Sequence, residues 1–156
     1  MSEIPPFREI QLINLLVDIL RTLHPDAVIE DDIKVGPALR MDIVLFEQNV
    51  IHAVDVQGTP PQTLGRLEER LVKLAQYRDA IAVKYRSANV TLALATPAEL
   101  TAEKMERLRS ANVKVWDRQW ILDAASKVDL LARAETLLAA AALRESRQRL
   151  DVLPPR

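Results

Sequence analysis

Cysteine is absent from this chain of 156 residues, and it has only two histidines and three glycines. Without cysteine there can be no disulfide, no thiol catalysis and no zinc site built on cysteine. Two histidines are too few for a multi-histidine metal site, and three glycines cannot form a nucleotide-binding loop of the Rossmann or Walker A type. Any chemistry must therefore come from carboxylates, lysines, arginines and amides.

Long apolar runs and an excess of charge are also missing. No segment approaches 18 uninterrupted apolar residues, so we expect no membrane span and no membrane partner. The first six residues carry an acid and no basic stretch, which argues against a signal peptide. With 49% hydrophobic residues and a net charge of −1, the composition predicts a cytoplasmic globular protein with a real core.

Hydrophobic periodicity predicts a helix followed by three strands in the first part of the chain. Apolar residues recur at three- and four-residue steps over 5–23, and looser alternation over 27–35 indicates a strand. The segments 42–46 and 50–57 are rich in β-branched residues and flank a short turn, which predicts an antiparallel hairpin. A leucine stripe at helical spacing then predicts a helix over the following residues.

The second part of the chain predicts a strand–helix–strand unit and a helical C-terminus. Residues 90–95 form an apolar run typical of a buried strand, and 113–116 form another. Between them the sequence Thr-Pro-Ala-Glu at 96–99 matches a capping box, so we expect a helix over 97–111. A helical pattern continues from Trp120 onward. The sum is an α/β fold, α-β-β-β-α-β-α-β-α, with a mixed central sheet.

Two aspartates and a glutamine on the predicted hairpin are the residues most informative about chemistry. Asp55 and Gln57 share a face because strand side chains alternate, and Asp42 opens the neighbouring strand. The two carboxylates should therefore meet at the open end of the hairpin. Like charges at close range repel unless a cation lies between them, and Mg²⁺ (or Mn²⁺) suits such a pair. The sequence predicts a metal site at Asp42 and Asp55, with solvated strand ends as the alternative.

The order of elements and the hairpin acids resemble the core of the PD-(D/E)xK nuclease superfamily. The matching segments are Met41-Asp42-Ile43-Val44 and Val54-Asp55-Val56-Gln57. Residues 94–117 resemble the last strand–helix–strand of Mrr-type restriction endonucleases, where a threonine follows one strand and an aspartate ends the next. The resemblance covers roughly 5–122. It implies a restriction endonuclease-like domain over 1–130, with an extra C-terminal helix, that hydrolyses phosphodiester bonds in DNA through Mg²⁺-activated water.

The same resemblance implies which acids serve the site. Asp42 and Asp55 would be both catalytic residues and metal ligands. Glu9 is a further candidate, because the superfamily often draws an acid from its first helix into the metal site. The alternative for Glu9 is an acid that stabilises the positive end of a helix.

The chain departs from the superfamily at Gln57, which stands where a lysine is usual. That lysine orients or polarises the attacking water and offsets charge on the phosphate. An amide can position water by hydrogen bonds but brings no positive charge. Some restriction enzymes of the superfamily carry glutamine here, and Lys73 and Lys34 are candidates to supply the missing charge.

Basic residues leave only a weak nucleic-acid footprint. Segment 66–86 has a basic bias and three arginines lie near the C-terminus, yet the sequence pI is about 6.1. Two alternatives to an active nuclease follow. One is a catalytically inactive relative that serves as a DNA-binding or protein-assembly module. The other is an interaction domain in which the C-terminal element, 131–156, forms a homodimer or joins a larger assembly.

Overall fold

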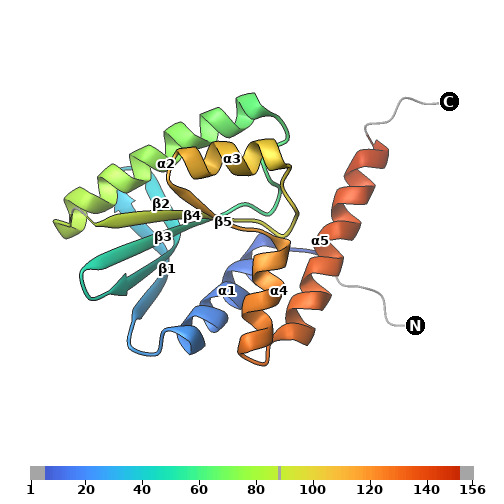
Figure 1. Ribbon diagram of the computed structural model, residues 1–156, viewed down its shortest axis with the longest axis horizontal. Coiled ribbons are helices and arrows are strands. Elements are labelled where there is room, and N and C mark those ends of the chain that lie inside the picture. The colour runs from blue at the N-terminus through green and yellow to red at the C-terminus, as the bar shows by residue number, and fades with distance from the viewer. Residues whose placement is uncertain (1–5, 88, 152–156) are drawn as a thin grey trace.

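The computed structural model describes residues 6–87 and 89–151 (Figure 1). In this part of the chain it shows a mixed α/β fold with a five-stranded mixed sheet and five helices. The elements in chain order are α1 (Glu9–Leu23), β1 (Val28–Gly36), β2 (Leu39–Glu47), β3 (Val50–Val56), α2 (Leu64–Tyr85), β4 (Val90–Ala95), α3 (Ala102–Ser110), β5 (Val113–Trp116), α4 (Arg118–Lys127) and α5 (Leu131–Asp151).

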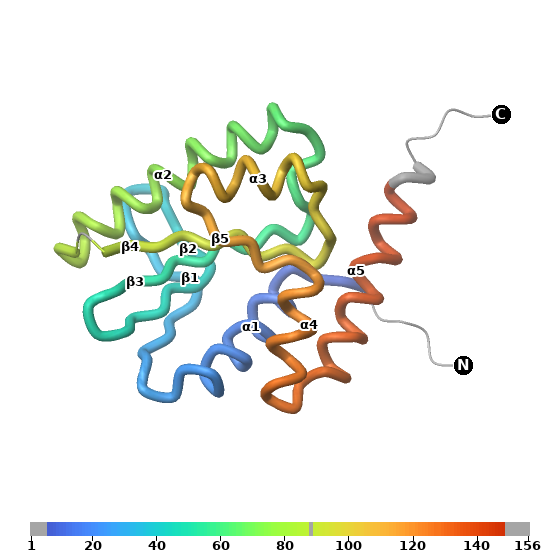
Figure 2. The backbone as a smooth tube through the Cα atoms, viewed as in Figure 1, coloured from blue at the N-terminus to red at the C-terminus, as the bar shows by residue number. Residues whose placement is uncertain are grey.

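The sheet follows the order of the chain, β1-β2-β3-β4-β5, and changes character at its centre. β1, β2 and β3 are antiparallel neighbours, whereas β3, β4 and β5 are parallel. The parallel pairs require crossovers, which α2 and α3 supply. The tube in Figure 2 shows α2 and α3 on one side of the sheet and α1, α4 and α5 on the other. The predicted mixed sheet is confirmed.

Each face of the sheet carries its own apolar cluster. On one side, buried leucines and isoleucines of α1 pack with Ile43 and Val54 and with alanines of α4 and α5. On the other, Leu67, Leu71 and Leu74 of α2 pack on the opposite face of β2, β3 and β4. Burial on both faces explains why β4 is almost wholly apolar.

The first helix is shorter than the sequence predicts. It begins at Glu9, and Pro6 lies outside it; position 5 falls outside the described residues. Arg8 is extended, and its N–H donates to the side chain of Gln11 at 3.0 Å. Phe7 is only 5% exposed, so the extended entry lets this ring join the core before the helix starts.

The helix predicted over 97–111 also begins late, at Ala102. Its cap is Thr101, whose hydroxyl accepts a backbone N–H at 3.3 Å. The capping-box interpretation of 96–99 was wrong: the Thr96 N–H donates to the carbonyl of Trp116 at 2.9 Å, and its buried hydroxyl accepts no backbone N–H from the described residues. The chain becomes helical only after Thr101.

The helical C-terminus forms two helices rather than one. Asp117 caps α4, accepting the N–H of Trp120 at 3.1 Å, and the chain breaks between α4 and α5, where Asp129 has a φ of 59°. α5 contributes Ala134 and Leu138 to the α1 side of the core. Its role as an oligomerisation element remains a prediction. No helix among the described residues combines the length and apolar character needed to cross a membrane.

Candidate functional site

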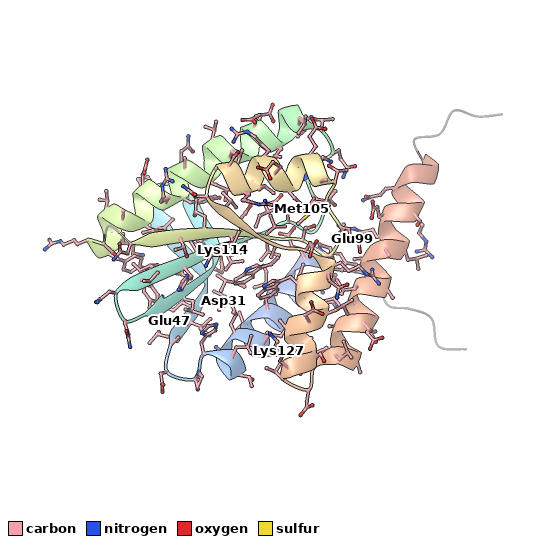
Figure 3. All side chains as sticks on the ribbon, viewed as in Figure 1. Asp31, Glu47, Glu99, Met105, Lys114 and Lys127 are labelled. Atoms are coloured by element: carbon pink, nitrogen blue, oxygen red, sulfur yellow. The ribbon has the colours of Figure 1, made fainter. Side chains whose placement is uncertain are left out.

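The candidate site lies where β3 ends. Figure 3 helps to place it, because Glu47 marks the closed turn of the β2–β3 hairpin and Glu99 marks the opposite end, after β4. The register pairs Ile43 with Val54, so the next positions outward are Asp42 and Asp55. Directly opposed residues of antiparallel strands project from the same face. The hairpin therefore places both aspartates at its open end, where the charge of Asp55 acts on Asp42.

Asp42 also closes the backbone ladder at this point. Its Oδ2 accepts the N–H of Val56 at 2.7 Å, from the neighbouring strand. The N–H of Gln57 is used in the other direction, donating to the carbonyl of Ala95 on β4 at 2.8 Å. β3 is thus held on both sides at its last residues, which fixes the side chains that follow.

Asp55 is buried and fully engaged. Its side chain is about 2% exposed, and Arg70 of α2 binds it with two donors: Nε donates to Oδ2 at 2.7 Å and Nη2 donates to Oδ1. Gln57 donates from Nε2 to the same carboxylate, at 3.2 and 3.1 Å from its two oxygens. A charge removed from water requires this kind of compensation. The Arg70 guanidinium is accordingly the counter-ion of Asp55.

The Asp42 carboxylate, unlike that of Asp55, is not neutralised by a bound cation among the described residues of the protein. Burial raises the pKa of its carboxyl to about 6, and the negative charges of Asp55 and Glu9 push in the same direction. The Val56 N–H and the charge of Arg70 lower that pKa and only partly offset the rise. One carboxylate of the pair is therefore compensated while the other is held in surroundings that favour its neutral form. A cation beside Asp42 would reverse that preference.

Glu9 reaches the site from the first turn of α1. Its Oε2 accepts the N–H of Gly58 at 2.9 Å, just beyond β3. A Cβ at Gly58 would lie 3.0 Å from that oxygen and 3.1 Å from the ring of Phe7, so a larger residue would crowd both side chains. Glu9 therefore joins α1 to the end of β3, and its charge acts on Asp42.

The chemistry available to these groups is that of oxygen ligands. In the described part of the chain, no three acidic or histidine side chains are close enough to hold a metal ion among themselves. A cation here would thus depend on Asp42 and Asp55, with waters completing its shell. Mg²⁺ is commonly bound in this way, by one or two carboxylates with waters and substrate phosphates.

Arg70 is the site residue that sequence reasoning missed. It appears in the sequence only as part of the basic segment of α2, and its pairing with Asp55 depends on how α2 packs against β3. Its guanidinium also lies 5.9 Å from the ring centroid of Tyr77, and Lys73 lies 5.6 Å from the same ring. Burial raises the pKa of the Tyr77 phenol. The only sequence feature that could have pointed to Arg70 is the spacing of the basic residues along α2, after the hairpin.

A cleft of about 650 Å³ opens beside this arrangement. The loop after β3 and the first turns of α2 line it, and its charged members are Arg66, Glu69, Arg70 and Lys73, with Gln57 at the hairpin end. Arg66 and Glu69 lie 3.6 Å apart as an ion pair. Lys34 is elsewhere, opposite Arg40 on the β1–β2 ladder. Of the two lysines considered as replacements for the missing charge, Lys73 is the one that lines this cleft.

Comparison with known proteins shows a likeness of fold but no match in sequence. No protein-family model and no curated protein matches the sequence. Among solved structures, the fold is similar to Can2 from Sulfobacillus thermosulfidooxidans in complex with cyclic tetra-adenylate (cA4), with a TM-score of 0.52 and 14% identity over 79% of this chain. The two share a related fold. The match covers 33% of Can2, so this chain spans about a third of its length, and the likeness concerns the fold alone.

Proposed function

We propose that this protein is a divalent-metal-dependent nuclease that hydrolyses phosphodiester bonds in DNA, on a restriction endonuclease-like core. The observation that carries the proposal is that Asp42 and Asp55 lie one residue beyond the last pair of the β2–β3 register, where the charge of Asp55 acts on Asp42, in surroundings that raise the pKa of Asp42 to about 6. The element order α-β-β-β-α-β-α-β, followed by two further helices, supports the assignment of the core.

The donor set fits Mg²⁺ or Mn²⁺. Asp42 and Asp55 offer carboxylate oxygens, which hard cations prefer, and the excess negative charge around Asp42 is what a cation would neutralise. Asp42 and Asp55 would hold the ion. When bound, it would lower the pKa of a water and stabilise charge on the phosphate.

The protein's own groups prepare the remainder of the site. Gln57 fixes the orientation of Asp55 by its two hydrogen bonds, and the amide can position water on its other side. Glu9 anchors the loop after β3 through Gly58. The cations Arg66 and Lys73 line the adjoining cleft, where they can bind phosphates of a DNA strand.

A second function is favoured by a specific contact. Because Arg70 binds Asp55 with two donors, a protein cation already neutralises one proposed metal ligand. The same core could therefore serve as a non-catalytic DNA-binding or protein-assembly module, with the acid pair retained as structure. Gln57, in place of a charged lysine, supports this alternative.

Plasmid cleavage separates the two functions. We would compare wild type, D42N and D79N on supercoiled plasmid with Mg²⁺, Mn²⁺, Ca²⁺ or EDTA; Asp79 is an exposed carboxylate on α2, which makes D79N a matched control. An active nuclease predicts nicking by wild type and D79N in Mg²⁺ or Mn²⁺, and at least a 100-fold loss in D42N. Absence of cleavage by folded wild type, together with DNA binding in Ca²⁺ gel shifts, would support the module instead.

A further inference from the structure

Arg70 and the proposed metal ion would compete for the same carboxylate, that of Asp55. It binds both oxygens of Asp55, a carboxylate that is also a proposed metal ligand. The Asp55 side chain is about 2% exposed, so little water can share its charge. Gln57 occupies further lone pairs of the same group. A divalent ion that binds Asp55 must therefore displace a contact of Arg70 or of Gln57, and repulsion between the ion and the guanidinium favours the loss of an Arg70 contact.

The cleft beside Arg70 offers its side chain an alternative position. Its side chain is about 25% exposed and lines the cleft of about 650 Å³ together with Arg66 and Lys73. The guanidinium also lies 5.9 Å from the ring centroid of Tyr77. A guanidinium presents its donors as a planar fork that matches both a carboxylate and a phosphate. The side chain can thus exchange one anionic partner for another of the same geometry.

We propose that Arg70 is an exchangeable counter-ion: it holds Asp55 while the site lacks metal, and it contacts a phosphate of the DNA substrate in the cleft once a divalent ion has taken Asp55. This inference rests on the proposed nuclease function. In this exchange Arg70 would supply the positive charge that a lysine at position 57 provides in the superfamily. Metal binding and the delivery of Arg70 to the substrate are then a single exchange of ion pairs.

The exchange predicts effects of opposite sign on metal affinity and on cleavage. Replacing Arg70 by glutamine removes the competing cation, so R70Q should bind Mn²⁺ about tenfold more tightly than wild type, as expected when one nearby unit charge is lost. The same variant should cleave plasmid at least tenfold more slowly at saturating Mn²⁺, because the phosphate contact is lost. R70K keeps the charge without the fork, so we expect about threefold tighter Mn²⁺ binding and partial cleavage.

Free Mn²⁺ can be titrated by electron paramagnetic resonance at pH 8, with circular dichroism as a check on folding. R78Q is the matched control: Arg78 lies on the same helix, outside the cleft, 3.9 Å from Asp79, and its replacement should change neither quantity. If R70Q does not fold, R70K carries the test.

The failures can be told apart. Unchanged or weaker Mn²⁺ affinity in folded R70Q, or in R70K where R70Q is unfolded, overturns the exchange but leaves the nuclease proposal intact. Faster or unchanged cleavage by the variant overturns the phosphate contact. Absence of Mn²⁺ binding by wild type overturns the proposed function and the exchange with it.

Discussion

Asp42→Asn should stabilise the metal-free protein at neutral pH. Burial, together with the negative charges of Asp55 and Glu9, raises the pKa of the Asp42 carboxyl to about 6 from an ordinary value of 3.8. Between those two values the native state holds a proton that the unfolded chain has lost. Stability contributed by this group therefore decreases as pH rises from about 4 to about 6, and the ionised carboxylate costs stability above pH 6.

The magnitude follows from the same two values. A pKa difference of about 2 corresponds to about 3 kcal/mol at roughly 1.4 kcal/mol for each pH unit. Solvent reaches part of the Asp42 side chain, so we take about half of this, or about 1.5 kcal/mol. The carbonyl of an asparagine can still accept the Val56 N–H, which now lies 2.7 Å from Oδ2. D42N should thus gain about 1.5 kcal/mol at pH 8 and about nothing at pH 4, or roughly 3–6 °C at pH 8.

Urea unfolding in EDTA, followed by tryptophan fluorescence at pH 4 and pH 8, measures this difference. D79N, which removes an exposed carboxylate from α2, serves as control and should be neutral at both pH values. If D42N were as stable as wild type or less stable at pH 8, the ionised Asp42 carboxylate would not destabilise the fold, contrary to the prediction.

Three further predictions concern neighbouring groups. Thr96→Val should raise the free energy of unfolding by about 1 kcal/mol in urea titrations, because the buried Thr96 hydroxyl has no hydrogen-bond partner among the residues that the structure describes. Thr101→Ala should lower it by about 1 kcal/mol through loss of the α3 cap, and an unchanged value would contradict that cap. Glu9→Gln removes a charge that raises the pKa of Asp42, so carbon-13 NMR should show Asp42 titrating at lower pH, whereas an unmoved midpoint would place Glu9 too far away.

The sequence predicts the architecture well where local signals agree with tertiary packing. The apolar run at 90–95 and the β-branched hairpin form the strands expected, because both are buried on the sheet. The predicted start of a helix is wrong where tertiary contacts set the path of the chain. Phe7 is drawn into the core before α1, and Thr96 is held by the β5 backbone although its sequence matches a cap. Local pattern alone does not contain those contacts.

The candidate site also combines features that the sequence predicts with features that depend on tertiary packing. The position of Asp42 and Asp55 at the open end of the hairpin follows from the register, which is local, and the sequence predicts it. That the two carboxylates share a metal ion stays a prediction. The partner of Asp55 does not follow from any local pattern, because Arg70 arrives from a helix whose packing depends on the leucines beneath it. The sequence suggests Lys73 or Lys34 for the missing positive charge, whereas the cation bound to the same carboxylate as Gln57 is Arg70.

Anomalous scattering from manganese-soaked crystals would locate the ion that the proposed nuclease requires. We expect one Mn²⁺ peak about 2 Å from an oxygen of Asp42 and about 2 Å from an oxygen of Asp55, with the guanidinium of Arg70 moved toward the cleft. An absence of density between the two aspartates at saturating Mn²⁺, with Arg70 still paired to Asp55, would contradict it.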